Sequence, residues 1–482
     1  MLVEQWKLRR AFAANLSTMY GREVPAYTTL VEVAREVNRD VAARDGRDAC
    51  RLGSLDRVTA ERHGAIRVGT PNELRVVATI FAGFGMHPVG FYDLRDTATR
   101  PVPVVSTAFR PTDAKELDRN PFRVFTSMLT VGDERFFDAG LRSRLTRFLD
   151  ARELFPPGIV ELARRAEADG GLTDDDAHAF IELAVRTFEL STEPVDRSWY
   201  AELERISSVA ADIGGVSTTH INHMTPRVLD IDDLQHRMTA RGITMIDAIQ
   251  GPPRWDGPQV LLRQTSFRAL AEPRVLREPD GSLSQGSLRV RFGEVEARGI
   301  ALTPAGRSAY DALMHDCDLG SSAEPDAAAS IALDLWSSRF PGTEQQLRDS
   351  QFAYFRYRPG SAPTGPIRPT TDLDELVRNG SVVVAPIVYE DFLPRSAAGI
   401  FQSNLDSDGS RTQGTTSTRY DSEWMSGAID RQVQDPYALY AREQQTSIKR
   451  TADQLGLAHP ADRLIRHTAA TRQTMKPTQE TP

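Results

Sequence analysis

Three histidines stand in apolar runs of the chain, where an imidazole could bind a metal ion. His63 precedes Val68 by five residues, and His223 precedes Val228 by the same distance. Because strand residues three apart point to opposite faces, His220 and His223 are not expected to bind the same ion. The matched spacing favours His63 and His223 as equivalent positions, although either could equally be a hydrogen-bonded core residue.

A third ligand could come from residues 289–298, where charged and apolar residues alternate. Glu294 and Glu296 are two residues apart, so both would face the same side of a strand. The same alternation is typical of a strand with one solvent-facing side, and the spacing does not choose between the two carboxylates. Two imidazoles and one carboxylate would form a facial triad with open coordination positions, and ferrous iron suits that combination best.

Arg67 follows His63 by four residues, so the two side chains would share one face of an extended strand. A metal can chelate a 2-oxo acid while a neighbouring guanidinium binds the far carboxylate, which predicts a dicarboxylate substrate. The alternative is an arginine in a surface salt bridge, but the run around Arg67 is otherwise apolar.

These side chains need strands and helices to position them. The patterns predict a strand at 63–68, a helix that begins at the capping sequence 70–73 and stops at Gly85, and strands at 89–94, 104–109 and 122–130. The same β-α-β-β-β opening recurs at His223, with a helix at 231–241 and strands at 260–267, 288–298 and 382–389. An internal repeat is therefore expected.

The segments between these modules read as helices and loops. We expect N-terminal helices at 1–55, a first βαβββ module at 56–135, a helical insertion at 136–215, second-module strands at 216–300, a helical insertion at 301–350, final core strands with a substrate loop at 351–405, and an exposed loop, a C-terminal helix and a polar tail at 406–482.

Composition narrows the class of protein. The chain has 482 residues, 40% hydrophobic content and a formal net charge of -8, which predicts a globular protein and argues against a broad nucleic-acid surface. No long apolar run and no secretory signal are indicated, so we expect a cytoplasmic enzyme without membrane contact. Cys50 and Cys317 lack the spacing of a disulfide framework or a zinc site.

Several segments in order resemble one enzyme family. Residues 61–70, 220–227, 262–267, 291–296 and 389–394 are similar to the 2-oxoadipate dioxygenase/decarboxylase family, also called 2-hydroxyglutarate synthase, and the similarity extends from about residue 12 to 455. The resemblance implies an α+β fold with a vicinal-oxygen-chelate-like β-barrel core, built from two βαβββ-type modules with large helical insertions.

The resemblance also implies a site and a reaction. The Fe(II) ligands fall on His63, His223 and Glu294, the substrate arginine falls on Arg67, and the substrate loop after Pro394 contains Arg395 and Ser396. The implied partners are a small 2-oxo dicarboxylate and O2. The expected reaction converts 2-oxoadipate and O2 to 2-hydroxyglutarate and CO2, a step of lysine catabolism.

The sequence leaves two alternative functions open. Residues 299–307 resemble the wing-and-helix segment of winged-helix DNA-binding proteins, although no basic recognition helix precedes them. A vicinal-oxygen-chelate isomerase or hydrolase with Zn, Mn or Ni would keep the site and change the chemistry, and oxygen uptake separates it from a dioxygenase.

Overall fold

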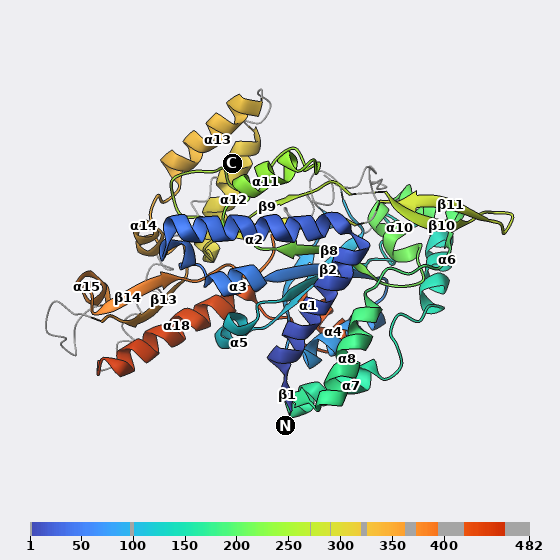
Figure 1. The fold of residues 1–482 in the computed structure, drawn as a ribbon, viewed down its shortest axis with the longest axis horizontal. Coiled ribbons are helices and arrows are strands. Elements are labelled where there is room, and N and C mark those ends of the chain that lie inside the picture. Colours follow the sequence, from blue (N-terminus) through green and yellow to red (C-terminus); the bar gives the residue numbers. More distant parts are fainter. Residues whose placement is uncertain are drawn as a thin grey trace, which may run out of the picture. The chain divides into compact units, whose positions relative to one another are not determined.

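The computed structural model describes residues 2–96, 101–269, 271–289, 291–319, 325–361, 373–393 and 419–457. The chain forms two compact units, one of Met1–Pro252, Leu262–Arg298 and Glu390–Pro436, the other of Pro253–Leu261, Gly299–Tyr389 and Tyr437–Pro482. Helices and several small sheets occur together (Figure 1), so the predicted α+β class is confirmed.

The first unit contains most of the strands and helices. Its strands are β1 (Val3–Glu4), β2 (Arg62–Val68), β3 (His87–Asp93), β4 (Val104–Arg110), β5 (Arg123–Leu129), β6 (Gly171–Leu172), β7 (Val195–Asp196), β8 (Ile221–Pro226), β9 (Leu262–Ser266), β10 (Glu272–Arg277), β11 (Leu283–Leu288) and β12 (Glu294–Arg298). Its helices are α1 (Gln5–Glu23), α2 (Pro25–Asp45), the 3-10 helix η1 (Asp48–Cys50), α3 (Leu55–Ala60), α4 (Pro71–Gly83), α5 (Ala114–Arg119), α6 (Ala139–Asp150), α7 (Ile159–Asp169), α8 (Asp174–Thr187), α9 (Arg197–Glu204), α10 (Ser208–Gly214), α11 (Ile231–Ala240) and α17 (Ser422–Ile429).

A five-stranded sheet in the order β3-β4-β5-β2-β8 forms the centre of this unit. Strand β2 runs parallel to β5 on one side and antiparallel to β8 on the other. Every residue of β2, β4, β5 and β8 is buried, so these strands are covered on both faces. A strand buried on both faces can carry polar side chains only where they meet partners, which makes the histidines of β2 and β8 notable.

The described chain after α3 has the element order β2-α4-β3-β4-β5, with the short helix α5 between the last two strands. The predicted capping box of α4 is confirmed, because the Thr70 side chain accepts from the Glu73 backbone and the Glu73 side chain accepts from Thr70. Pro71 occupies the first turn, where its missing N–H costs nothing. Helix α4 therefore begins where the sequence predicts and ends at Gly83, two residues before the expected stop.

The second set of strands begins with β8 and α11 and continues with β9 and β12, which pair antiparallel. A single bridge between Arg227 and Glu296, with the Val228 N–H donating to the Glu296 carbonyl at 2.8 Å, joins β12 to the end of β8. A closed β-barrel is not detected within the described ranges. The strands there form separate sheets, because the pairing between β8 and β12 does not extend beyond that bridge.

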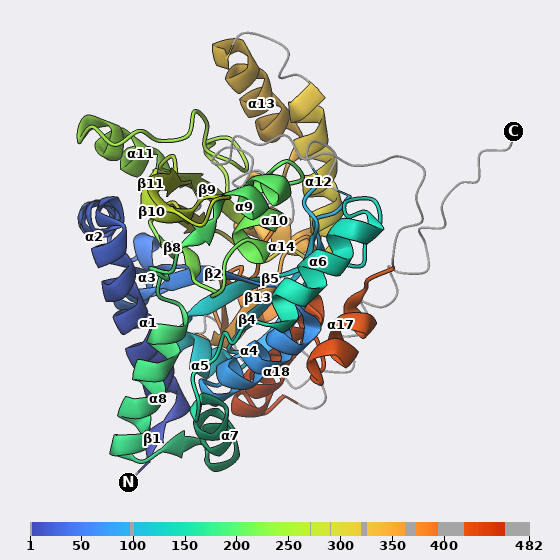
Figure 2. The same ribbon diagram turned by 90° about the vertical axis from the view of Figure 1, so that its right-hand side faces the viewer.

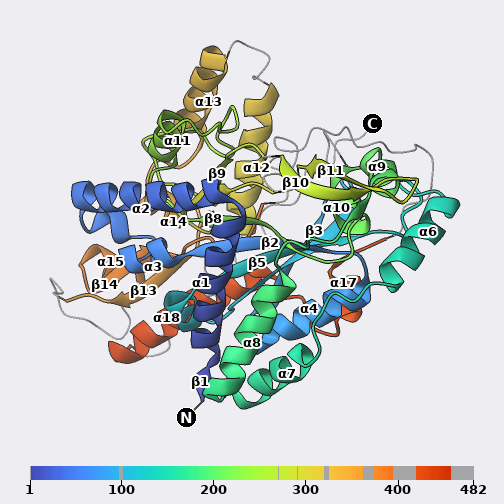
Figure 3. The ribbon, with the colours of Figure 1, turned by 45° about the vertical axis from the view of Figure 1, so that its right-hand side comes forward.

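The N-terminal helices cover this sheet and fix its strands. Figure 1 shows α2 running alongside β8, and Asn38 of α2 donates to the Arg227 carbonyl and accepts from the Leu229 N–H. Helices α1, α7 and α8 gather near the N-terminus, where β1 pairs with β6 (Figure 2 and Figure 3). The Phe12 ring of α1 stacks on Phe84 with 4.5 Å between ring centroids.

The second unit contains the helices α12 (Pro304–Leu319), α13 (Pro325–Arg339), α14 (Glu344–Asp349), α15 (Leu373–Arg378) and α18 (Pro436–Gln454), and the paired strands β13 (Phe355–Pro359) and β14 (Val382–Pro386). The strand expected at 382–389 thus pairs with β13.

Ala301 and Leu302, in the segment that resembled a wing, are buried, whereas a DNA-binding wing has to be exposed. Among the described helices, none is long and apolar enough to cross a membrane.

The buried Tyr20 hydroxyl links α1 to β8 and to the residues just before β12. The Tyr20 hydroxyl lies 3.0 Å from the Asn222 carbonyl of β8 and 2.7 Å from the Phe292 carbonyl, just before β12. We predict that Tyr20→Phe destabilises the protein by about 1 to 3 kcal/mol, because buried carbonyls lose a donor. The change should appear as a lower unfolding temperature and faster amide exchange at 221–226 and 294–298.

The matched control is Tyr27→Phe. Tyr27 is equally buried, but its hydroxyl contacts the Ser17 side chain within the two N-terminal helices and does not reach β8 or β12. If both variants accelerate exchange in β8 and β12 to the same degree, the tie through Tyr20 is not what holds those strands.

Candidate metal centre

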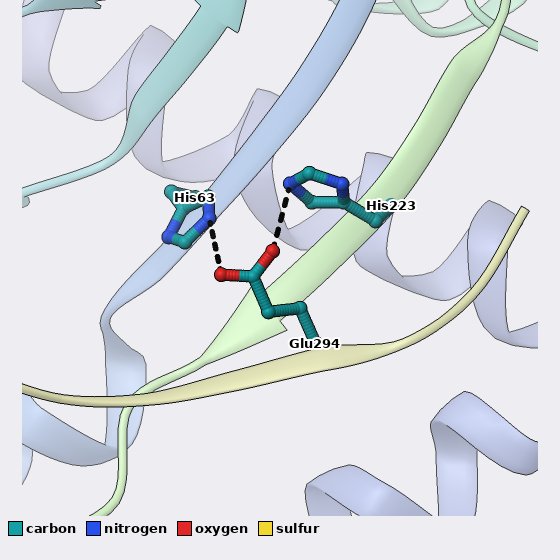
Figure 4. A group of neighbouring side chains, drawn as sticks. All are labelled: His63, His223 and Glu294. Carbon is teal, nitrogen blue, oxygen red and sulfur yellow. Dashed lines mark ion pairs between the residues drawn. The ribbon is translucent and has the colours of Figure 1, made fainter. Parts of the chain in front are cut away.

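Two neighbouring strands place two imidazoles on one face of the sheet. In the register between β2 and β8, His63 lies opposite Thr225 and Ala65 lies opposite His223. Residues directly opposite each other point to the same side, and so do residues two apart. The two rings therefore meet, with 5.5 Å between their centroids (Figure 4).

Glu294 reaches the same place from β12. Its Oε1 lies 3.8 Å from His63 Nε2, and its Oε2 lies 3.5 Å from His223 Nε2 (Figure 4). The preceding residue has to be glycine, because a Cβ at Gly293 would lie 2.1 Å from the Phe267 ring. This close approach brings the start of β12 against the end of β9 and directs Glu294 toward the two histidines.

Burial determines the charge of these groups. All three side chains are almost fully buried, at 0%, 5% and 2% exposed for His63, His223 and Glu294. Burial lowers the pKa of both histidines, and the nearby charges of His63 and Arg67 lower that of His223 further. Burial, followed by the neighbouring Glu296 carboxylate, raises the pKa of Glu294 well above its usual range.

These properties fit a bound cation. One donor atom from each of the three residues lies within 4.8 Å of the others, and neither ring nitrogen of the buried His63 has a hydrogen-bond partner among the described residues. Neutral imidazoles are the form that binds metals, and a cation would stabilise the ionised form of Glu294. The three predicted ligands therefore come together as a buried set consistent with a metal site.

Two further side chains contact the ligands from outside. Gln264 of β9 donates from Nε2 to Glu294 Oε1, and Glu296 Oε2 lies 3.2 Å from His63 Nδ1. Burial would raise the pKa of Glu296, but Arg298, His63 and Arg123 outweigh it and lower that pKa to about 2. Both glutamates of β12 thus face inward, and the alternative of a solvent-facing side for this strand is wrong.

Arg67 points into the same interior and is bound by a carboxylate. Its Nη1 donates to Asp212 Oδ2, and Asn222 Nδ2 donates to the same oxygen at 2.8 Å. His220 Nε2 lies 3.3 Å from the other oxygen of Asp212. Burial would raise the pKa of Asp212, but its contacts with His220 and Arg67 outweigh it and keep the carboxylate ionised. Arg67 is 4% exposed, so a surface salt bridge is excluded.

The structure also explains why His220 is not one of the three. The register between β2 and β8 shifts between Ala65 and Ile66, and β8 begins only at Ile221. Strict alternation therefore does not extend to His220, whose ring contacts Asp212 and Asn222. Of the two histidines, only His223 lies in the group with His63 and Glu294.

The remaining predicted residues, Arg395 and Ser396, lie outside the described residues. Sequence reasoning missed the roles of Asp212 and Gln264. Asp212 could have been noticed as a single carboxylate within the apolar run of α10. Nothing in the local pattern marks Gln264, because four of the five residues of β9 are polar.

Comparison with known proteins gives one consistent result. The family model described as 2-oxoadipate dioxygenase/decarboxylase matches residues 12–404. A protein of Mycobacterium tuberculosis named 2-oxoadipate dioxygenase/decarboxylase is 58% identical over 434 residues, which cover 90% of this chain and 95% of that protein. A Pseudomonas putida protein of the same name is 42% identical over 462 residues, covering 93% of this chain and 97% of that protein.

A solved structure agrees with the sequence matches. The hydroxyglutarate synthase of Pseudomonas putida, determined in complex with 2-oxoadipate, superposes with a TM-score of 0.81 at 39% identity. The match covers 95% of this chain and 99% of that chain.

The geometry predicts which side chains a divalent metal needs. His63→Ala and His223→Ala should each lower metal affinity by more than the roughly 10- to 100-fold that changes outside the ligand shell cost, because each removes a donor. His220→Ala is the control, since this buried histidine lies three residues from His223 but outside the cluster. Affinity is measured by anaerobic competition with a chromophoric chelator. If all three variants lose metal affinity equally, the loss comes from removing a buried side chain and not from removing a metal ligand.

Proposed function

The chain belongs to the 2-oxoadipate dioxygenase/decarboxylase family, and from this premise we propose that it binds Fe(II) at His63, His223 and Glu294 and converts 2-oxoadipate and O2 to 2-hydroxyglutarate and CO2. The observation that carries the proposal is the buried set of two imidazoles and one carboxylate beside a buried arginine. When bound at such a set, ferrous iron supplies open coordination positions and the reducing electrons that activate dioxygen.

Arg67 gives the site its preference for a dicarboxylate. The side chain shares the inner face of β2 with His63, and its charge acts on His223, so the guanidinium lies within electrostatic reach of the metal ligands. A guanidinium can bind a carboxylate through two parallel N–H donors. We assign Arg67 to the carboxylate of the substrate that is distant from its keto group.

Asp212 holds this arginine in place. Its own position is fixed by Asn222 and His220, and the Arg67 backbone is fixed by the Thr219 hydroxyl, which donates to the Arg67 carbonyl at 2.8 Å. An arginine bound in this way loses little conformational freedom when substrate arrives. The role of Asp212 in this proposal is therefore to orient the guanidinium.

Apolar side chains keep water away from the reacting atoms. Ala65 lies between His63 and Arg67 on the inner face of β2, and it packs with Tyr92, Ala108, Phe125 and Phe392 in one buried cluster. The Phe392 ring meets the His63 ring edge to face with 5.0 Å between centroids. Excluding water protects an oxidising intermediate from side reactions and strengthens the hold of Arg67 on a carboxylate.

The strand order supports a vicinal-oxygen-chelate-like arrangement. The order β2-α4-β3-β4-β5 follows one βαβββ module. The order β8-α11-β9-β10-β11-β12 begins a second, with the paired strands β10 and β11 inserted between β9 and β12. We infer that the two modules are related halves, each of which supplies one histidine from its first strand. On this proposal the module boundaries remain those predicted at 56–135 and 216–300, and Arg395 and Ser396 belong to the substrate loop.

Oxygen consumption tests the reaction. The protein is reconstituted anaerobically with Fe(II), mixed with 2-oxoadipate and then exposed to O2. We expect equimolar O2 uptake, CO2 release and 2-hydroxyglutarate, because the oxygen atoms lost as CO2 and retained in the hydroxy acid balance one O2. The His63→Ala variant is the control. Conversion of the substrate without oxygen uptake would instead favour the isomerase or hydrolase alternative.

The proposed role of Arg67 is tested with two substrates of equal chain length. We expect Arg67→Ala to lower kcat/KM for 2-oxoadipate by about 10- to 100-fold, the loss of a charge-assisted hydrogen-bonded pair of about 1.5 to 3 kcal/mol. Turnover of 2-oxohexanoate, which lacks the far carboxylate, should change little. Steady-state kinetics and metal affinity are measured together.

Arg152→Ala is the matched control, because Arg152 is also a buried arginine but pairs with Glu73. If Arg67→Ala reduces metal affinity and the turnover of both substrates by the same factor, its role is structural.

A further inference from the structure

The two glutamates of β12 approach opposite nitrogens of one imidazole. Glu294 Oε1 lies 3.8 Å from His63 Nε2, and Glu296 Oε2 lies 3.2 Å from His63 Nδ1. The two residues are neighbours on one face of the strand, so the strand itself sets the separation between their carboxylates. A histidine that offers Nε2 to a metal presents Nδ1–H to a second acceptor. In the described residues Nδ1 has no aligned hydrogen-bond partner, and the carboxylate that approaches it is Glu296.

Glu296 is fixed by charge as well as by packing. It is fully buried, and both its oxygens accept from Arg298, Oε1 from Nε at 2.5 Å and Oε2 from Nη2 at 2.9 Å. Arg123 Nη1 lies 3.4 Å from Oε1. The contact with His63 therefore comes from a carboxylate whose position is already determined.

The two arginines have carboxylate partners of their own. Glu61 Oε1 lies 2.8 Å from Arg123 Nη1 and 3.6 Å from Arg298 Nε. The Glu390 carboxylate also pairs with Arg123. A buried ion cluster of this kind is weak evidence for stability, because the desolvation cost of its members offsets much of their attraction. What distinguishes Glu296 within the cluster is its contact with a proposed metal ligand.

We propose that Glu296 is a positioning residue for the metal centre. It accepts the Nδ1–H of His63, which fixes the tautomer and the ring orientation, directs the lone pair of Nε2 toward the metal and raises the basicity of that nitrogen. The inference rests on the proposed metal centre at His63, His223 and Glu294. Arg298 and Arg123, which Glu61 pairs with in turn, hold this acceptor in a fixed position.

Two substitutions separate the contact from the charge. Glu296→Gln keeps an acceptor oxygen and removes the charge, whereas Glu296→Asp keeps the charge and withdraws it by one methylene. We expect both folded variants to bind Fe(II) or Co(II) about 10- to 100-fold more weakly than the unchanged protein. Affinity is measured by anaerobic competition with a chromophoric chelator, and unfolding temperature is measured without metal.

The matched control is Asp133→Asn. Asp133 is also fully buried between two arginines, with Oδ2 2.8 Å from Arg95 Nη1 and 2.7 Å from Arg135 Nη2, but within the described ranges it does not contact a histidine. The Asp133→Asn variant should have a lower unfolding temperature, as the Glu296 variants should, but its metal affinity should be unchanged. Metal affinity unchanged in both Glu296 variants would overturn the proposal and leave Glu296 a structural role.

A measurement on the unchanged protein avoids any dependence on folding of the variants. In the Zn(II)-loaded protein labelled with ¹⁵N-histidine, the nitrogen shifts of His63 should report a metal-bound Nε2 and a protonated Nδ1. A metal-bound Nδ1 would overturn the inference. Failure of the unchanged protein to bind any divalent metal would instead contradict the proposed function, so the two failures are distinguishable.

Discussion

The site depends above all on the register between β2 and β8. With Ala65 opposite His223, the two histidines and Arg67 share the inner face of the sheet. Because side chains alternate along a strand, a slip of one residue would turn one histidine away from the other. The register is held by close packing, since a Cβ at Gly64 would come within 2.7 Å of the Ile221 side chain. Gly64 thus leaves room for the end of the Ile221 side chain between the two strands.

The charged side chains buried around the centre are paired with groups of opposite charge. Next to the centre stand carboxylates that contact the ligands or the arginine, and behind them stand arginines whose own partners are further carboxylates. Each ion would be costly alone in a dry interior, so the network tolerates change poorly. The same network gives the polar groups at the centre charged partners in fixed positions. Charged groups in fixed positions orient a substrate and limit side reactions of the oxidant.

The sequence predicted the parts of the site that depend on local pattern. The apolar runs around His63 and His223 do form the buried strands β2 and β8, and the capping box at 70–73 marks the start of α4. The equal spacing to a following valine is not a sign of equivalent positions, because Val68 ends β2 whereas Val228 lies beyond β8. The choice of Glu294 over Glu296 could not be made from alternation, because both face inward. Asp212 comes from a helix far along the chain, and only tertiary packing brings it to Arg67. The barrel remains a prediction, since strand closure depends on long-range pairing that a local pattern does not encode.

The surroundings of the centre favour oxidative decarboxylation over isomerisation. Isomerases of the vicinal-oxygen-chelate type need a group that takes up a proton from the substrate, with a pKa near the working pH. Burial raises the pKa of Glu294, but its oxygens would be occupied by the metal. The pKa of Glu296 is kept low mainly by Arg298, and that of Asp212 by His220 and then Arg67. A carboxylate held ionised in this way is a poor base. Loss of CO2 from a 2-oxo acid requires no proton removal from carbon, so a centre with two imidazoles, a metal-binding glutamate and a clamped arginine is sufficient for it.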